Sequence, residues 1–341
     1  MRVKVAATFV AAVVVASAHA STLPPPSFRL AWFPSAIAAA GPRVAIASAD
    51  CTILVATLAG NSKRVAVRAP QQCRDNESDV ALWDLWLGRA ALAITTIDAP
   101  SPHGESYALW TGPLPRGPLR QQGDDWGWTD SDEPHTFGCA WSIAAGGGVI
   151  ASAQVPNTLG PYETACPAGP SSKIMLSGAA PAQLTVAGSW SILATDGKRL
   201  ALARLDQVGR ETGELAVFDL HGKRLAAPKL APAVVKSAFK GWLAPEGLVV
   251  ETGRGVSGPG WTVSGGRAAT VAEGRLLYLK GRTVRVRRLL GGADRALLKL
   301  PTSRALLAAG SFGLAIATGT DESSRVFRVP WRTIDRTLPR R

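Results

Sequence analysis

The feature that most constrains the fold is a short recurring motif: an apolar strand-like segment, a glycine turn and a second apolar segment. The clearest copy runs from Ile192 to Ala203, with Asp196-Gly197 at its centre. Asp-Gly between two apolar runs is a strong short-range signal of a β-hairpin. Weaker copies surround six further positions along the chain: Gly41, Gly88, Gly147, Gly247, Gly274 and Gly313.

The spacing of these seven glycines predicts a repeat architecture. The successive intervals are 47, 59, 50, 50, 27 and 39 residues, and five of them lie near the ~40–50 residues of a β-propeller blade. The interval of 27 residues leaves open that two of the motifs belong to one blade, which would then be counted twice. A second hairpin at His221-Gly222 brings one unit to the four strands that a blade needs. We therefore predict an all-β propeller of four-stranded antiparallel sheets, with seven blades and six as the alternative.

One unit resembles a known repeat. Residues Thr195–Ala201 read Thr-Asp-Gly-Lys-Arg-Leu-Ala, which is similar to the repeat core of TolB-like and WD40-like propellers, where an Asp-Gly-Lys turn precedes a small apolar strand. Val217–Leu220 resembles the third strand of that repeat. The resemblance implies the propeller fold and no single activity, because such propellers support many functions.

The first twenty residues have the parts of a secretory signal peptide. Arg2 and Lys4 supply a positive start, residues 5–15 are apolar and uncharged, and Ala18 and Ala20 are the small residues that precede a cleavage point. The apolar run is about half of the ~20 residues that span a bilayer. We expect a signal peptide over 1–20, the Sec pathway, and a secreted or periplasmic mature protein without a transmembrane segment.

The mature chain is expected to consist of a linker, one propeller domain and a short basic tail. Residues 21–27 contain three consecutive prolines and predict a linker. Residues 28–336 are expected to form a single propeller, followed by a basic tail over 337–341. A strand at 28–33 is expected to pair with 325–329, which would close the ring and leave few exposed strand edges.

The four cysteines favour disulfide bonds. Their number is even, and the expected compartment is oxidising. Three pairings are possible, of which we favour Cys51–Cys73 and Cys139–Cys166 because each lies within one local unit. A zinc site is the alternative, but the chain has no Cys-x-x-Cys motif.

The positive charge is concentrated near the C-terminus. The formal net charge is +13; residues 21–274 carry 21 basic and 21 acidic side chains, whereas 275–341 carry 15 basic and 4 acidic. One interpretation is a surface that binds anionic envelope polymers. The other is a solvated strand face, because arginines alternate with valines at 284–287. The candidate anion-binding residues are Lys280, Arg282, Arg285, Arg287 and Arg288.

The segment 124–135 has the most unusual composition, with five acids, two tryptophans and one histidine. Tryptophan faces and carboxylates suit a sugar, and several oxygen ligands suit Ca²⁺, although Pro134 and His135 break the EF-hand pattern. A solvated loop is the third interpretation. The candidate ligand-binding residues are Asp124, Asp125, Trp126, Trp128, Asp130, Asp132, Glu133 and His135.

Catalytic motifs are absent from the sequence. It contains no Gly-x-Ser-x-Gly and no His-Glu-x-x-His. A glycosidase would need two facing carboxylates, such as Asp84 or Asp125 with Glu163, and sequence spacing cannot place them together. The eleven tryptophans are expected mainly to pack between blades, with some lining a central pocket.

We therefore expect a non-enzymatic binding or protein-interaction module. A carbohydrate-binding or carbohydrate-active protein using 124–135 is one alternative, and an anion binder using the C-terminal blades is another. We expect a protein or glycan partner, no nucleic acid because of export, no cofactor other than Ca²⁺, and a monomer.

Overall fold

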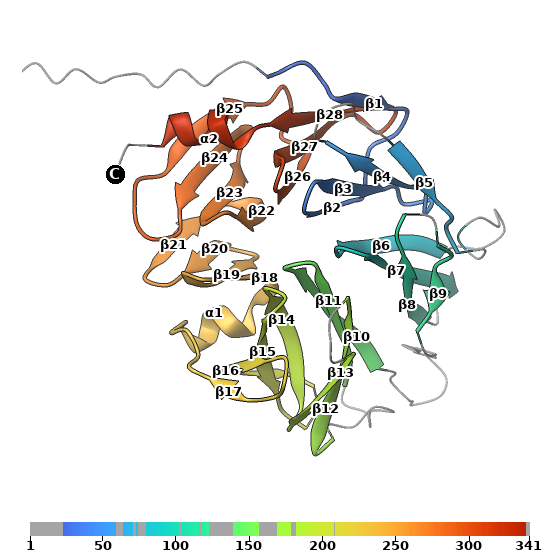
Figure 1. Ribbon diagram of the computed structural model, residues 1–341, viewed down its shortest axis with the longest axis vertical. Coiled ribbons are helices and arrows are strands. Elements are labelled where there is room, and N and C mark those ends of the chain that lie inside the picture. The colour runs from blue at the N-terminus through green and yellow to red at the C-terminus, as the bar shows by residue number, and fades with distance from the viewer. Residues whose placement is uncertain are drawn as a thin grey trace, which may run out of the picture.

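The computed structural model describes residues 23–58, 64–70, 73, 80–101, 104–115, 117–122, 139–156, 169–178, 182–207 and 209–338. Within these residues, 28 strands form seven separate four-stranded antiparallel sheets. The sheets stand around a common axis (Figure 1). Seven radial sheets of this kind form a seven-bladed β-propeller, which confirms the predicted fold class and the larger of the two blade numbers.

Each blade is one sheet, and its strands follow one another outward from the axis. Blade 1 contains β2 (Ala36–Ala40), β3 (Arg43–Ala47), β4 (Ile53–Thr57) and β5 (Arg64–Val67). Blade 2 contains β6 (Val80–Leu87), β7 (Ala91–Ser101), β8 (Gly104–Pro113) and β9 (Arg120–Gln121). Blade 3 contains β10 (Cys139–Gly146), β11 (Val149–Pro156), β12 (Ser171–Ser177) and β13 (Gln183–Ala187). Blade 4 contains β14 (Trp190–Thr195), β15 (Arg199–Leu205), β16 (Glu211–Asp219) and β17 (Arg224–Leu225).

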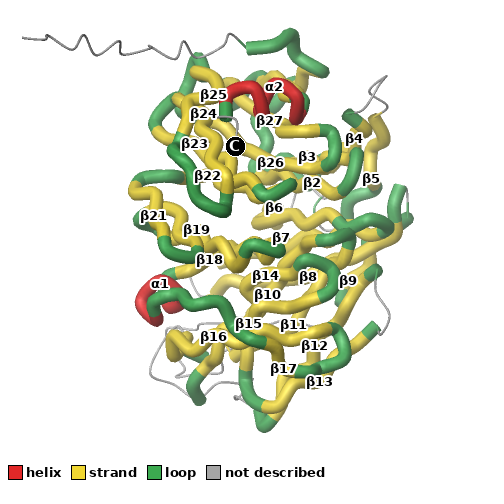
Figure 2. The backbone as a smooth tube through the Cα atoms, turned by 60° about the vertical axis from the view of Figure 1, so that its left-hand side comes forward, coloured by secondary structure: helices red, strands yellow, loops and turns green. Residues whose placement is uncertain are grey.

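The remaining blades complete the ring, with two short helices at its periphery in both views (Figures 1 and 2). Blade 5 contains β18 (Ala238–Ala244), β19 (Gly247–Thr252), β20 (Gly255–Gly258) and β21 (Trp261–Ser264). Blade 6 contains β22 (Arg267–Ala272), β23 (Arg275–Lys280), β24 (Thr283–Arg288) and β25 (Arg295–Lys299). Blade 7 contains β26 (Ala305–Gly310), β27 (Gly313–Gly319), β28 (Ser324–Val329) and β1 (Phe28–Leu30). The helices are α1 (Pro232–Lys236) and α2 (Trp331–Thr337).

The recurring glycine motif marks the innermost hairpin of every blade. All seven anchor glycines lie in, or next to, the turn between the first and second strands. The short 27-residue interval does not divide a blade, because residues 238–264 alone form the complete blade 5. The irregular spacing therefore reflects loop length, not blade number.

The turn of the clearest copy shows why Asp-Gly-Lys suits this position. The Asp196 side chain accepts the backbone N–H groups of Lys198 and Arg199 at 2.9 and 2.7 Å and also pairs with the Arg199 guanidinium. Gly197 adopts φ +83°, which a residue without a Cβ atom tolerates. These local hydrogen bonds and the conformation of Gly197 specify the hairpin independently of its packing against other strands.

The ring closes as expected from the sequence. Phe28 in β1 pairs with Val326 in β28, and Leu30 pairs with Ser324. The Ser324 hydroxyl also donates to the carbonyl of Trp32 at 2.6 Å. The N-terminal strand is thus the outer strand of the last blade, so the two ends of the propeller are joined.

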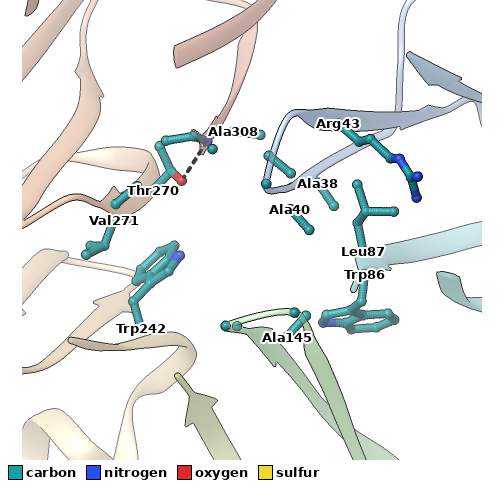
Figure 3. A pocket seen from close by; sticks show the side chains of 18 of the residues that line it. Ala38, Ala40, Arg43, Trp86, Leu87, Ala145, Trp242, Thr270, Val271 and Ala308 are labelled. Atoms are coloured by element: carbon teal, nitrogen blue, oxygen red, sulfur yellow. Dashed lines mark hydrogen bonds between the residues drawn. The ribbon is translucent and has the colours of Figure 1, made fainter. Parts of the chain in front are cut away.

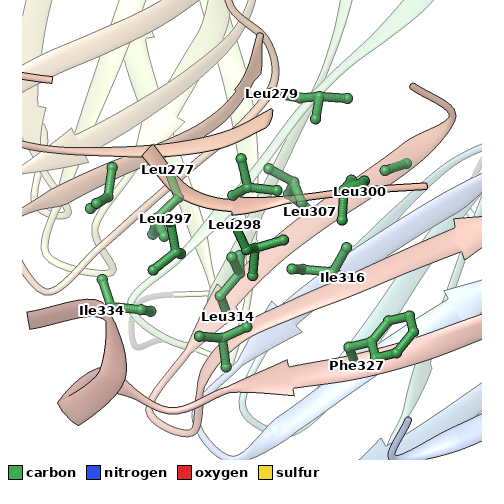
Figure 4. Packing of buried hydrophobic residues seen from close by; sticks show 14 of the residues in the cluster. Leu277, Leu279, Leu297, Leu298, Leu300, Leu307, Leu314, Ile316, Phe327 and Ile334 are labelled. Carbon is green, nitrogen blue, oxygen red and sulfur yellow. The ribbon is translucent and has the colours of Figure 1, made fainter. Parts of the chain in front are cut away.

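Hydrophobic packing between blades supplies the core. The described residues form seven buried clusters, each between two neighbouring blades. The cluster of blades 6 and 7 extends under α2, where Ile334 packs with Leu297 and Leu314 (Figure 4). The blades are thereby held by side-chain packing across their faces, as expected when each sheet is flanked by two others.

One of the two expected disulfides falls within the described residues. Cys51 and Cys73 are bonded, with a Cα–Cα distance of 5.7 Å. For the expected Cys139–Cys166 bond, Cys166 and the side chain of Cys139 lie outside the described residues. Among the described helices, none is long and apolar enough to cross a membrane.

Candidate functional site

The central channel opens into a cavity of about 510 Å³ near the beginnings of the inner strands. We call it the mouth cavity; β6, β10, β14 and β18 of blades 2 to 5 form most of its wall. Its volume lies within the ~300–1,000 Å³ that is usual for small-molecule sites. It is lined by Trp83, Asp84, Trp86, Thr95, Trp141, Ser142, Ile143, Ala144, Ala145, Ser191, Ile192, Leu193, Glu211, Ala238, Phe239, Lys240, Gly241 and Trp242.

A second cavity, of about 570 Å³, lies at the other end of the channel, where the inner hairpins turn. Figure 3 shows Trp86 and Trp242 on opposite sides of this space, whereas small residues such as Ala38 and Ala308 form other parts of its wall. The two tryptophans also line the mouth cavity. The two cavities therefore meet at these rings and form one channel.

A third cavity, of about 430 Å³, adjoins the mouth on the side of blades 5 to 7. It shares Asp84, Phe239 and Lys240 with the mouth cavity and adds Glu251 and Arg267. Asp84 and Lys240 line all three cavities. These two charged residues therefore lie where the spaces along the channel join.

Two β-bulges present these charged residues to the channel. The pairing of β6 with β7 shifts between Leu82 and Asp84, and the pairing of β18 with β19 shifts between Ala238 and Lys240. A bulge bends a strand and redirects its side chains, and bulges are frequent beside functional sites. Blades 2 and 5 thus each have a β-bulge in the innermost strand, next to a charged residue that lines the channel.

The bulged residues are both aromatic and both exposed. Trp83 is 61% exposed and Phe239 is 68% exposed, and both line the mouth cavity. Most large apolar side chains of the described fold are buried. An exposed aromatic pair at the rim of a cavity offers apolar faces to a ligand that enters it.

Burial shifts the acid–base properties of the channel acids. Burial raises the pKa of Asp84, Glu251 and Glu211 above the ordinary carboxyl range. The positive charge of Lys240 opposes this effect on Asp84 and Glu251, and hydrogen bonds from the Ser191 hydroxyl to Glu211 and from the Ala269 amide to Glu251 oppose it too. Perturbed carboxyls in a concave site are typical of functional positions.

Three residues of the mouth cavity carry a buried polar atom that has no partner among the described residues. They are the Thr95 hydroxyl, the indole N–H of Trp141 and the Oε2 atom of Glu211. Buried polar atoms in native proteins are nearly always hydrogen-bonded, and an unpaired one costs about 1–3 kcal/mol. Of the eight such atoms among the described residues, these three border the mouth cavity.

Four tryptophans outside the mouth cavity differ from Trp141 in their hydrogen bonds. The indole N–H groups of Trp110, Trp190, Trp261 and Trp331 each donate to an oxygen of the protein, at 2.7–3.2 Å. Arginines also cover three of these rings. The structure thus contains tryptophans that bond within the protein and others, such as Trp86 and Trp242, that line the channel.

Of the two sites predicted from composition, one lies outside the described residues and the other lies in blade 6. Residues 124–135, together with Glu163, lie outside the described residues. In the basic cluster, Arg285 pairs with Asp294 at 2.6 Å, and the Arg287 guanidinium lies 4.6 Å from the centre of the Trp261 ring. Lys280 and Arg282 are exposed at the turn between β23 and β24.

Sequence reasoning named Asp84 only as one candidate carboxylate and missed Lys240, Glu211 and Glu251. One sequence pattern could have pointed to Asp84 and Lys240 together. The sequences Trp83-Asp84-Leu85-Trp86 and Phe239-Lys240-Gly241-Trp242 share an aromatic residue, a charged residue and a tryptophan at the same spacing, each within an inner strand. No comparable pattern marks Glu211 or Glu251.

Together, the fold and this site define a seven-bladed β-propeller with a polar, aromatic-rimmed channel. No family model and no curated protein matches the chain. Among solved structures, a glucose dehydrogenase matches with TM-score 0.47 and 13% identity over 91% of this chain and 99% of that one. The WD40 propeller domain of Doa1 gives 0.47 and 12% over 90% and 98%. An aldose sugar dehydrogenase from Escherichia coli gives 0.42 and 12% over 89% and 98%.

These likenesses are too distant to carry a function, so the fold assignment rests on the seven sheets themselves. Within the described ranges, no group of three or more His, Cys, Asp or Glu side chains is arranged to hold a metal ion.

Proposed function

We propose that the chain is an exported binding protein that holds a small polar ligand in the mouth cavity. The observation that carries this proposal is the mouth cavity, bordered by buried polar atoms of Thr95, Trp141 and Glu211 that have no partner among the described residues. Such atoms are retained against their cost in stability when a site requires them. A binding role needs no reaction centre, and it agrees with the lack of catalytic motifs in the sequence.

Two observations support export. Residues 1–20 have the composition of a cleavable signal peptide. The Cys51–Cys73 bond is of the kind that persists in oxidising compartments. The Sec pathway and a periplasmic or extracellular location complete the proposal.

A thermal-shift screen tests the binding role. The mature protein is mixed with neutral, cationic and anionic small molecules, because a ligand that binds only the native state raises the melting temperature. We expect at least one class to stabilise wild type and to lose its effect on the Glu211→Gln variant. Arg29→Ala is the control, since Arg29 is exposed on the outer strand β1. Absence of stabilisation by every class would contradict the proposal.

A second function follows from the exposed corner of blade 6. Lys280 and Arg282 lie at one turn, and Lys299, which is also exposed, pairs with Thr283 on the neighbouring strand. We propose that these charges retain the protein on anionic envelope polymers. Retention on immobilised polyphosphate should fall steeply with salt, because exposed charges are screened, and should fall in a Lys280→Ala/Arg282→Ala variant; salt-independent retention would contradict it.

A further inference from the structure

We propose that the ligand of the mouth cavity is a neutral sugar, with its ring against the aromatic rim and its hydroxyl groups bonded to Trp141, Thr95 and Glu211. This inference rests on the proposed binding function and specifies its ligand. Hydrogen-bond chemistry, the aromatic surfaces and the charge balance of the cavity each support it.

The unpaired atoms discriminate between ligand classes. The indole N–H of Trp141 only donates a hydrogen bond, the ionised carboxylate of Glu211 only accepts, and the Thr95 hydroxyl does either. An ammonium group cannot accept from Trp141, and a carboxylate group cannot donate to Glu211. Hydroxyl groups satisfy all three, and a sugar carries several on one small ring.

The aromatic side chains at the rim of the cavity suit the apolar face of a sugar ring. Trp83 from blade 2 and Phe239 from blade 5 are exposed at the mouth, and Trp86 and Trp242 lie deeper. A sugar ring has C–H groups on its faces and hydroxyls around its edge, so it can bury an apolar face on an aromatic ring while its edge remains available for hydrogen bonds.

The charges of the cavity favour a neutral molecule. Asp84 and Glu211 supply two carboxyls and Lys240 supplies one ammonium, whose Nζ atom lies 5.5 Å from the centre of the Trp242 ring. Burial raises the pKa of both acids, and the positive charge of Lys240 partly opposes this rise for Asp84. The cavity therefore offers hydrogen-bonding groups of both signs, with one ammonium facing two carboxyls.

The three unpaired atoms are covered by neighbouring groups, so binding requires small side-chain rotations. Serine hydroxyls already organise the surroundings. The Ser142 hydroxyl accepts the backbone N–H of Ile192 at 2.7 Å, and the Ser191 hydroxyl donates to Glu211 at 3.3 Å. The first bond links β10 to β14, and the second links β14 to Glu211 on β16.

Titration calorimetry with defined probes tests the inference. The neutral panel contains glucose, galactose, mannose, N-acetylglucosamine, maltose, cellobiose and lactose; choline represents cations, and glucuronate and phosphate represent anions. We expect at least one neutral sugar to bind, and Trp141→Phe, Thr95→Val and Glu211→Gln each to weaken it at least tenfold. Trp83→Ala and Phe239→Ala, which change exposed rings, should also weaken it.

Trp110→Phe is the matched control, because the Trp110 indole N–H bonds to Thr96 within blade 2 and Trp110 does not line the mouth cavity. It should leave sugar affinity unchanged. A Trp126→Ala/Trp128→Ala variant separates the mouth from the segment 124–135. Sugar binding that this variant abolishes while the cavity variants preserve it would overturn the inference.

The remaining outcomes separate the inference from the proposed function. If choline, glucuronate or phosphate binds in a Trp141-dependent manner and no neutral sugar does, the sugar assignment is wrong and the binding role stands. If a neutral sugar binds with the same affinity to wild type and to all cavity variants, the sugar site lies elsewhere and the inference is overturned. If no probe binds, the sugar assignment fails, and a negative thermal-shift screen would then remove the binding function as well.

Discussion

Asp84 and Lys240 occupy equivalent positions in blades 2 and 5, each directly after an aromatic residue at a β-bulge. Burial raises the pKa of Asp84, and the positive charge of Lys240 partly opposes this rise, although the ion pairs between described residues do not include this pair. The two side chains therefore interact through the channel by charge at a distance. This interaction couples a charged residue of blade 2 to one of blade 5.

Removing this charge should raise the pKa of the acids that face it. In a Lys240→Met variant, burial of Asp84 and Glu251 continues to raise their pKa values, while the opposing effect of the ammonium is lost. Carboxyl ¹³C NMR titration should show both values above those of wild type. Lys236→Met, an exposed change on α1, is the control. Unchanged titration of both acids in Lys240→Met would show that Lys240 does not act on them.

Replacing Glu211 should change how stability depends on pH. Burial raises its pKa above the ordinary value of 4.5, so the folded state binds the proton more tightly than the unfolded state. The resulting stabilisation is fully present below pH 4.5 and is lost as pH rises through the raised value. Glu211→Gln should therefore gain stability relative to wild type between pH 4 and pH 7, measured by urea unfolding. An equal difference at both pH values would be inconsistent with the raised pKa.

Trp141 and Trp110 should respond differently to the same substitution. Trp141→Phe removes an unpaired buried N–H group, whereas Trp110→Phe removes a donor that bonds to Thr96 at 3.1 Å. Losing a made hydrogen bond costs about 1 kcal/mol, and losing an unpaired donor relieves a cost. Trp110→Phe should therefore destabilise more in denaturant unfolding. The reverse order would indicate that Trp141 has a partner within the fold.

The stability of the closed ring should depend on the buried side chain of Phe28 in β1. Phe28 is buried between blades 7 and 1, whereas Arg29 points to solvent from the same strand. Phe28→Ala should cost about 3 kcal/mol through lost packing, and Arg29→Ala should change the free energy of unfolding by less than about 0.5 kcal/mol. Chemical denaturation measures both. Equal effects would mean that the pairing of β1 does not stabilise the propeller.

Much of the fold could be predicted because it is encoded in local chemistry. Asp196-Gly197 specifies a tight hairpin by itself, and the strand at Phe28 has an alternating pattern that suits an edge beside β28. The Cys51–Cys73 bond was expected because both residues belong to one unit. Each of these features depends on short segments or on the repeat, so periodicity was sufficient.

The site could not be predicted in the same way. Asp84, Glu211 and Lys240 come from three blades, and only ring closure brings them to one cavity. Register adds a second difficulty, since the bulges at Trp83 and Phe239 determine which side chains face the channel. Composition instead pointed to 124–135, because clustered acids and tryptophans are visible in sequence, whereas residues that converge in space are not.

The central claim is that Trp141 belongs to a ligand site in the mouth cavity. The most direct measurement is the ¹H–¹⁵N spectrum of the indole groups during titration with the best-binding sugar, with the Trp141 signal assigned by its loss in Trp141→Phe. We predict that the Trp141 signal shifts with ligand concentration, while those of Trp110, Trp190, Trp261 and Trp331, which already bond within the protein, stay in place. A Trp141 signal that does not move when the ligand saturates the protein would contradict the account.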